Sequence, residues 1–227
     1  HTAAMSKPDE CMLYPEKCIA TNVTATALLL SAAKKNKVSK FIFISTDFVF
    51  GENGPHAEND EPQPLNFYGD SKLKAEQIVK QSGLNNCIIR PVFIYGPVWQ
   101  NMRSTFLHWV KENLEKGNAI KVVSDQLRTP TYVYDICAGI HAVIAGDKQG
   151  TFHLAGKDLL SPYHMAITVA AMLHLDSYLI EEATSDTFKE PVIRAKRSGL
   201  KIHKAIAELN YQPLSFEDGV KKTFNLP

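Results

Sequence analysis

The chain has 227 residues, of which 44% are hydrophobic, so it can bury a sizeable core and a disordered protein is excluded. Its 25 lysine and arginine residues nearly balance its 24 aspartate and glutamate residues, and the basic residues are scattered. This distribution lacks the electrostatic footprint of a nucleic-acid-binding or membrane-binding protein and indicates small-molecule chemistry.

The cysteines and histidines give no sign of a metal site or a disulfide framework. Cys11, Cys18, Cys87 and Cys137 form neither a Cys-x-x-Cys pair nor a zinc-ligand spacing, and the histidines are dispersed. We expect reduced thiols in a cytoplasmic protein. No run approaches the roughly 18 apolar residues of a membrane span, so we expect neither a membrane anchor nor a signal peptide.

The first part of the chain is predicted to alternate helices with buried strands. Apolar residues at helical spacing indicate a helix over 9–33, with Pro15 in its first turn. A strand is predicted over 40–45, apolar on both faces as in a buried parallel sheet. The polar loop 51–64 is expected to form one rim of a pocket. Two further elements follow, a helix over 66–80 and a strand over 87–90.

The second part of the chain is predicted to combine helices with short strands. Helices are expected over 104–116, 132–145, 162–173, 201–209 and 216–224. Strands are expected over 120–123, 151–154 and 178–181. Ser161 before Pro162, and Ser215 with Asp218 three residues further on, supply capping signals for two of these helices.

Three side chains near the strand 40–45 point to proton transfer at a sugar or alcohol carbon. Thr46 follows the carboxyl end of this strand, where ligands bind in open α/β sheets, and Tyr68 and Lys72 share one helix face. A phenol with a pKa near ~10 is a poor acid or base at neutral pH, but an ammonium and the positive ring of a cofactor lower that pKa. Tyr68 is therefore the candidate general acid or base, Lys72 its tuner, and Thr46 a hydrogen-bonding partner of the same substrate oxygen.

A Tyr-x-x-x-Lys pattern by itself is more often a packed aromatic residue followed by a solvated lysine. Here it occurs together with further motifs along the chain. These are Ser45-Thr46-Asp47-Phe48-Val49-Phe50, Glu58-x-Asp60-x-Pro62, Tyr68-Gly69-x-Ser71-Lys72-x-x-x-Glu76, Ile89-Arg90-Pro91, Gln126-x-x-x-Pro130-Thr131 and Arg197-Ser198-x-Leu200. In this combination the sequence resembles the extended short-chain dehydrogenase/reductase family, and within it the dTDP-4-dehydrorhamnose reductases.

The resemblance implies a fold and a division of the chain. It implies an α/β fold with a Rossmann-like, doubly wound parallel sheet and a smaller C-terminal α+β substrate domain. Residues 1–96 are expected to belong to the dinucleotide-binding domain, to which later segments return, and residues 97–227 mainly to the substrate domain. The implied cofactor is NADP or NAD, the implied partner is a nucleotide-sugar substrate, and a homodimer is possible.

The resemblance also implies roles for individual residues. Thr46, Tyr68 and Lys72 are the catalytic set. The cofactor-binding residues are expected to be Ala3, Ala4, Asn22, Ser45, Tyr68, Lys72, Pro91 and Val92. The substrate-binding residues are expected to be Thr46, Asp47, Phe48, Arg128 and Arg197, with Arg194 as an alternative to Arg197, because guanidinium groups match phosphate geometry.

Several of these residues also have an ordinary structural interpretation. Asn22 is equally well explained by a bond to a neighbouring loop, Pro91 and Val92 by an exit loop, and each arginine by a surface position. Trp99 and Trp109 are candidates for stacking on a base or sugar, although core packing is the simpler expectation for Trp109.

The sequence contains no strand-Gly-x-x-Gly-x-x-Gly-helix turn, which cradles a dinucleotide pyrophosphate. We therefore expect a preceding portion of about 60 residues with the first βαβ units. A natural half-domain is the alternative, but its exposed sheet edge would favour aggregation. Without that turn, NAD and NADP cannot be distinguished, and whether this chain alone is active stays open.

Three functions agree with these residues. The first is NAD(P)H-dependent reduction of a nucleotide-linked 4-keto-6-deoxy sugar, with Tyr68 as proton donor. The second is an NAD-dependent epimerase or dehydratase. Dehydratases of the family carry an acidic pair after the strand-end threonine, so Phe48 after Asp47 disfavours a dehydratase. The third is a non-catalytic regulatory subunit, because the β subunit of methionine adenosyltransferase is similar in the same motifs.

Overall fold

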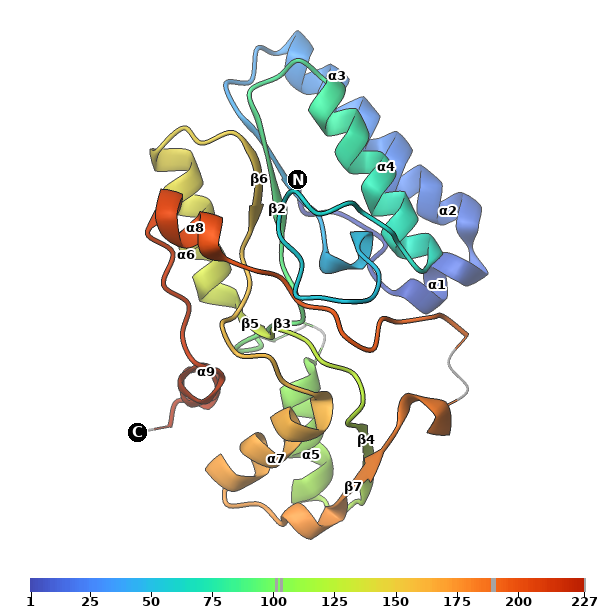
Figure 1. The fold of residues 1–227 in the computed structure, drawn as a ribbon, viewed down its shortest axis with the longest axis vertical. Helices are drawn as coiled ribbons and strands as arrows, with labels where there is room; N and C mark the ends of the chain where they lie inside the picture. The colour runs from blue at the N-terminus through green and yellow to red at the C-terminus, as the bar shows by residue number, and fades with distance from the viewer. Residues whose placement is uncertain (101, 103, 189–190, 227) are drawn as a thin grey trace.

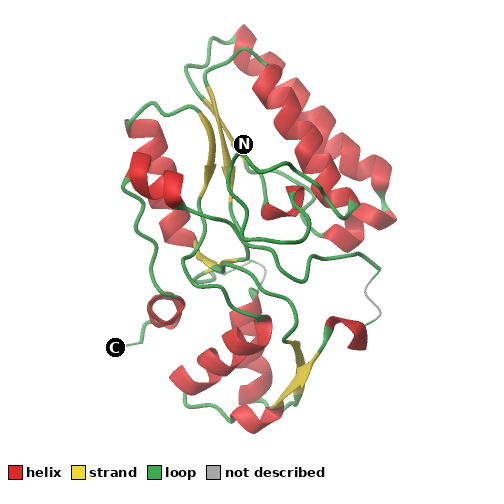
Figure 2. Cartoon of the chain, in the orientation of Figure 1, coloured by secondary structure: helices red, strands yellow, loops and turns green. Residues whose placement is uncertain are grey.

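The computed structural model describes residues 1–100, 102, 104–188 and 191–226. Within these residues the central element is a parallel sheet with the strand order β1-β2-β6. Its strands are β1 (Phe41–Ile44), β2 (Asn86–Arg90) and β6 (Gly150–His153). The N-terminal segment runs beside the other edge of β1, where the amide of Ile44 donates to the carbonyl oxygen of His1 at 3.1 Å. All three strands therefore end at one edge of the sheet (Figures 1 and 2).

Helices cover both faces of this sheet (Figure 1). One face carries α1 (Pro8–Leu13), α2 (Pro15–Ile19), a π-helical turn (Ala20–Thr24), α3 (Ala25–Lys35) and α4 (Phe67–Gln81). The other face carries α6 (Val133–Ala145) and α8 (His203–Leu209). This confirms the predicted doubly wound, Rossmann-like arrangement of a parallel sheet.

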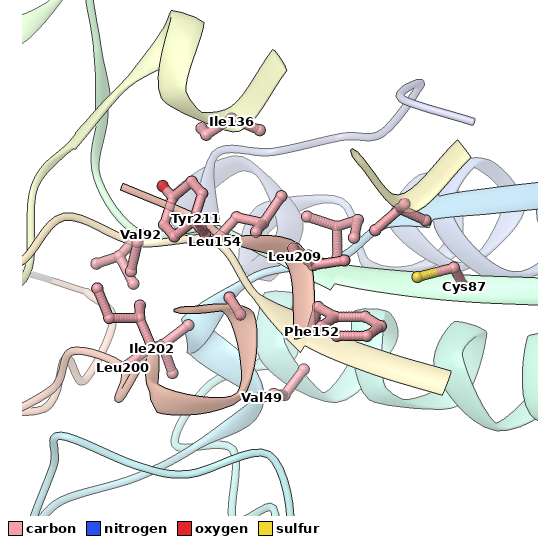
Figure 3. Close-up of a cluster of buried hydrophobic side chains, with 14 of the residues drawn as sticks. Val49, Cys87, Val92, Ile136, Phe152, Leu154, Leu200, Ile202, Leu209 and Tyr211 are labelled. Atoms are coloured by element: carbon pink, nitrogen blue, oxygen red, sulfur yellow. The ribbon is translucent and has the colours of Figure 1, made fainter. Parts of the chain in front are cut away.

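The side chains of the sheet alternate between two hydrophobic clusters, as the period of a strand requires. Phe43 and Ile88 pack with Leu30 and Val79 under α3 and α4. Cys87 and Ile89 point the other way, into the cluster drawn in Figure 3. Its labelled members come from β2 and β6, from the segments that follow the three strands, from α6 and α8, and from the chain around α8. Burial on both faces explains why β1 is apolar at every position and β2 at its three central positions.

A second group of elements lies beside the sheet (Figure 1). It contains α5 (Phe106–Glu115), β4 (Ile120–Val123), α7 (Pro162–Met172), β7 (Ile180–Ala183) and α9 (Phe216–Phe224). β4 and β7 pair in parallel, and the helices and strands of this group share one hydrophobic cluster. A short parallel pair, β3 (Ile94–Tyr95) with β5 (Thr131–Tyr132), lies between the two groups. The domain boundary at residue 96 stays a prediction.

The structure corrects several predicted elements. The helix expected over 9–33 is divided, because Tyr14 leaves the helical region (φ −128°, ψ 64°) and Pro15, which has no N–H, starts α2. The strand expected over 178–181 begins two residues later, because Ser177–Leu179 forms a 3₁₀ helix capped by Asp176. β3 and β5 were not predicted, since two residues are too few to show a strand period.

The loop 51–64 was expected to form a pocket rim, and the two cavities described below are lined by other residues. Among the described residues, this loop instead fastens the chain around residues 197–201. Amide hydrogens of Gly54 and His56 donate to the carbonyls of Arg197 (2.9 Å) and Gly199 (3.0 Å), and Lys201 returns a bond to His56 (2.7 Å). The loop is polar because its backbone and carboxylates bind another segment.

A buried ion pair joins α4 to the sheet. The guanidinium of Arg90, at the end of β2, donates two hydrogen bonds to the carboxylate of Glu76 on α4, at 2.8 and 2.6 Å. Arg90 is 1% exposed and Glu76 0% exposed, so water reaches neither charge. Arg90 also lies over the Phe50 ring at 4.8 Å. Removing one partner of such a pair leaves an unpaired charge in the core.

Glu76→Gln is therefore expected to lower the free energy of unfolding by about 3–5 kcal/mol. Urea unfolding followed by circular dichroism measures the loss. Lys80→Ala is the matched control, because Lys80 lies 3.7 Å from the same carboxylate but is half exposed, and should cost about 1 kcal/mol or less. Equal, small losses for both variants would contradict a structural role for the Glu76–Arg90 pair.

Candidate active site

A cavity of about 540 Å³ lies at the carboxyl ends of β1 and β2. Ser45 and Thr46 line it from the end of β1, and Pro91 from the end of β2. Tyr68 and Lys72 reach it from α4. The structure thus brings the three predicted catalytic residues to one cavity, of the size that small-molecule sites have.

The start of α4 is fixed so that Tyr68 and Lys72 face this cavity. The side chain of Asn66 caps the helix by accepting from the amide of Gly69 at 3.0 Å. A Cβ atom at Gly69 would lie 2.0 Å from the carbonyl oxygen of Phe48, so only glycine allows the helix to approach the loop after β1 this closely. Tyr68 and Lys72 then follow one helical turn apart on the same face.

Lys72 is buried and held by the main chain of β1. Its Nζ donates to the carbonyl oxygen of Ile44 at 2.7 Å and lies 4.1 Å from the centre of the Phe43 ring. Burial lowers the pKa of Lys72 to about 8, and the nearby Glu76 carboxylate opposes this shift. The ammonium therefore lies in the cavity wall but is easily deprotonated.

Tyr68 is buried beside Thr46 and Phe48. Its ring contacts Phe48 edge to face, with centroids 5.5 Å apart. Burial raises the pKa of the phenol, and the charge of Asp47 adds to this effect, while a hydrogen bond with Thr46 acts in the opposite direction. In the chain by itself, the phenol thus keeps its proton at neutral pH.

Not all residues predicted to bind a cofactor line this cavity. Ala4 does, whereas Ala3 and Val92 lie outside the lining, and Val92 is buried in the core. Asn22 binds the N-terminal segment and α4 instead: its amide donates to the Met5 carbonyl (3.1 Å) and to Ser71 Oγ (2.9 Å). This favours its structural interpretation.

Ser45 provides a test of whether the cavity fits a polar cofactor. Ser45 lines the cavity, and its buried Oγ has no hydrogen-bond partner among the described residues. A buried hydroxyl without a partner is costly, and such groups often await a ligand. Together with the Lys72 ammonium and the Pro91 backbone, Ser45 fits a group that carries hydroxyls and an amide.

A second cavity, of about 460 Å³, adjoins the first. The two share Asp47, Phe48, Phe93 and Phe106 in their linings. The second cavity is also lined by three cations, Lys121 of β4, Arg128 and Arg194, and by Trp109 and Phe188. A ligand with an anionic part and a flat part would match this lining.

Two of the three candidate arginines, Arg128 and Arg194, line the second cavity. Arg194 lines the second cavity and pairs with Asp9 of α1 at 2.9 Å. Arg197 lies outside both cavities, exposed, and its Nε donates to the Gly54 carbonyl at 2.9 Å. Arg128 is buried in the wall of the second cavity, where it donates to Gln126 Oε1 (2.7 Å) and Ser198 Oγ (2.6 Å).

The expectation that Trp109 packs in the core is wrong. Its side chain is 40% exposed, lines the second cavity and stacks on Phe106 with centroids 5.8 Å apart. Lys121 was missed by sequence reasoning. The only signal was its position in β4 between the buried residues Ile120 and Val122, which turns it away from the core.

All four cysteines are free thiols. Cys11, Cys18 and Cys87 are buried free thiols and Cys137 is an exposed one. In the part of the chain that the structure describes, no group of three metal-binding side chains occurs. The helices described are also too short or too polar to cross a membrane.

The fold and the site define a Rossmann-type α/β protein with a strand-end Thr, Tyr and Lys set. Residues 1–226 match the RmlD substrate binding domain family, and the chain belongs to this family. The chain is 30% identical to the probable low-salt glycan biosynthesis reductase of Haloferax volcanii over 219 residues, covering 95% of this chain and 73% of that protein.

Two further comparisons describe the range of relatives. A solved dTDP-4-dehydrorhamnose reductase from Bacillus anthracis, in complex with NADP, superposes with a TM-score of 0.91 at 25% identity, covering 98% of this chain and 78% of that one. The methionine adenosyltransferase 2 subunit beta of Danio rerio is 32% identical over 183 residues, or 78% of this chain. The chain spans 56% of the length of that subunit.

The depressed pKa of Lys72 predicts a pH-dependent effect of Lys72→Met on stability. Below pH 8 the folded chain holds a buried charge that the unfolded chain exposes to water, so methionine should stabilise the fold. Between pH 8 and 10.5 only the unfolded state keeps the proton, so the wild type gains stability and the difference shrinks by about 2 kcal/mol.

Urea unfolding of the wild type and Lys72→Met at pH 7 and pH 10 measures this change. Lys34→Met on the exposed surface of α3 is the control, and its difference from the wild type should stay constant with pH. A Lys72→Met difference that is the same at both pH values would show that burial does not disfavour the charged lysine.

Proposed function

We propose that the protein containing this chain is an NADP(H)- or NAD(H)-dependent reductase of a nucleotide-linked 4-keto-6-deoxy sugar. One observation carries the proposal: Thr46, Tyr68 and Lys72 share a strand-end cavity that adjoins a second cavity lined by cations and aromatic side chains. The similarity to reductases, one of them in complex with NADP, supports this assignment.

The first cavity would hold the nicotinamide part of the cofactor, against Ser45, Lys72 and Pro91. When bound, the reduced cofactor supplies a hydride for the keto carbon. Tyr68 would donate its proton to the keto oxygen, and its raised pKa keeps that proton available at neutral pH. Thr46 would hold the same oxygen in line.

Lys72 would assist after the proton has left Tyr68. A phenolate in a buried site is costly, and an ammonium in the same wall stabilises it. Burial holds the pKa of Lys72 near 8, so the side chain is mostly charged at neutral pH and can pass a proton on. Its bond to the Ile44 carbonyl fixes its position at the end of β1.

The second cavity would hold the nucleotide diphosphate. Lys121 and Arg194 offer positive charge to the phosphates, and Trp109 with Phe106 offers a flat apolar surface to a base. Asp47 and Phe48 lie where the two cavities meet and would contact the sugar. Arg128 would support this wall from its buried position.

A second candidate function is a non-catalytic binding subunit. The 32% identity to a methionine adenosyltransferase subunit beta favours it as much as the identity to a reductase favours catalysis. Retention of all three of Thr46, Tyr68 and Lys72 supports catalysis. An epimerase would share these residues, whereas a dehydratase would need a second carboxylate where Phe48 stands. Sugar-dependent consumption of NADPH separates the reductase from all three.

Tyr68→Phe tests the proton donor. In the natural protein, with NADPH and dTDP-4-dehydrorhamnose, the variant is expected to lose about a hundredfold or more of kcat, because the phenolic proton is absent. NADPH absorbance follows turnover, and the Kd of NADPH should change little. Near-normal turnover would exclude Tyr68 as the acid. Absence of sugar-dependent NADPH consumption by the wild type would exclude the reductase.

Arg194→Met tests the diphosphate site, with Arg197→Met as the matched control. Loss of the cavity-lining guanidinium is expected to raise KM for the nucleotide sugar about tenfold with little change in kcat. Arg197 lies outside both cavities, so its variant should keep the wild-type KM. The reverse pattern would restore the assignment of the phosphate site to Arg197.

A further inference from the structure

The carboxylate of Asp47 lies where the two cavities meet and is held from two sides. Asp47 contributes to the lining of both cavities. Its Oδ1 accepts from Thr46 Oγ1 at 3.3 Å and its Oδ2 from Ser198 Oγ at 3.2 Å. Asp47 and Ser198 are both buried, so solvent does not replace these bonds.

Ser198 connects this carboxylate to a buried cation. Arg128 Nη1 donates to Ser198 Oγ at 2.6 Å and to the Ala195 carbonyl at 3.2 Å. A hydroxyl has one proton, so a serine that accepts from a guanidinium must direct its own proton elsewhere. Asp47 is the nearer acceptor at 3.2 Å, compared with 3.5 Å to the Leu127 carbonyl.

The hydrogen bond from Ser198 to Asp47 affects the protonation of a buried carboxyl group. Burial raises the pKa of its carboxyl group, whereas Arg128, Ser198 and Thr46 act against that shift. Among the described residues, Arg128, from the segment between β4 and β5, and Tyr68, from α4, interact with Asp47 electrostatically. Lys72 lines the first cavity with Asp47, and Lys121 and Arg194 line the second. Ser198 and Thr46 supply the hydroxyls that donate to the carboxylate.

We propose that Ser198 is a positioning residue of the active site, which holds the Asp47 carboxylate ionised and directed toward the junction of the two cavities as an acceptor for a sugar hydroxyl. The role of Asp47 toward the sugar rests on the proposed function. An ionised carboxylate only accepts hydrogen bonds, whereas a protonated one donates one and loses acceptor capacity. Ser198 thereby affects substrate binding without contacting the substrate.

The main chain, not the hydroxyl, keeps Ser198 in place. Its amide donates to the Leu127 carbonyl at 3.0 Å, and the neighbouring amide of Gly54 bonds to the Arg197 carbonyl. A Cβ atom on Gly54 would lie 2.8 Å from the backbone of Ser198, which shows how closely the two segments pack. Substitution of the Ser198 side chain is therefore expected to leave this segment where it is.

The first measurement reports on Asp47 without using turnover. Carboxyl-carbon NMR of protein labelled with ¹³C-aspartate follows the titration of Asp47, assigned by the signal that Asp47→Asn removes. Ser198→Ala, and Ser198→Cys, which keeps the volume but is a weak donor, should each raise the midpoint by about one pH unit. Ser198→Thr, which retains the hydroxyl, should restore it.

The second measurement reports on the substrate. At a pH near the shifted midpoint, about half of the variant Asp47 and about nine-tenths of the wild-type Asp47 are ionised. Ser198→Ala and Ser198→Cys should therefore raise KM for dTDP-4-dehydrorhamnose about twofold there, and the difference from the wild type should fade as pH rises. The Kd of NADPH should stay unchanged. Ser124→Ala is the control, because Ser124 Oγ donates to the Ala183 carbonyl and Ser124 lines neither of the two cavities.

The two measurements separate the inference from the proposed function. An unchanged Asp47 titration in both Ser198→Ala and Ser198→Cys overturns the positioning role, whatever the turnover. A second outcome is that the Ser198 variants shift the Asp47 titration relative to the wild type while neither they nor the wild type consume NADPH with the sugar. That result upholds the control of Asp47 by Ser198 and rejects the reductase. A shifted titration with an unchanged, pH-independent KM overturns the link from Asp47 to the sugar.

Discussion

The buried pair between Glu76 and Arg90 is the interaction on which the rest of the site depends. It fixes α4 against β2, and thereby fixes Tyr68 and Lys72 against the strand ends that carry Ser45 and Pro91. Because both charges are shielded from water, a shift of α4 would leave the Glu76 carboxylate and the Arg90 guanidinium unpaired in the core, which is costly. The positions of the lining residues Tyr68 and Lys72 thus depend on an ion pair whose own residues do not line the cavity.

A second set of contacts closes the site from the opposite side. The loop 51–64 binds the backbone of residues 197–201, and this segment carries Ser198 to Asp47. Residues from distant parts of the chain thus meet at the junction of the two cavities. The pair of β3 with β5 lies between the sheet and the second group of elements and adds a further parallel contact there.

Local patterns were sufficient for the sheet, α4 and the strand-end set, because apolar runs and the Tyr68–Lys72 spacing are encoded by neighbouring residues. The second cavity was not predictable in detail. Arg194 and Arg197 are three residues apart, and only the course of the backbone decides which one faces the cavity. Trp109 has the same difficulty, since a helical tryptophan next to Val110 looks like core until its neighbours are known. The role of the loop 51–64 depends on a partner over 130 residues away.

The anchor of Lys72 has a consequence for how this chain can vary. Its Nζ is held by the carbonyl oxygen of Ile44, which belongs to the main chain and is present whatever side chain occupies that position. Substitutions along β1 can therefore change the packing of the sheet without removing the acceptor. Only a change of register, which moves the whole backbone by a residue, would take that carbonyl away. The hydrogen bond of Lys72 should therefore persist through point substitutions in β1, whereas a single inserted or deleted residue there should remove it.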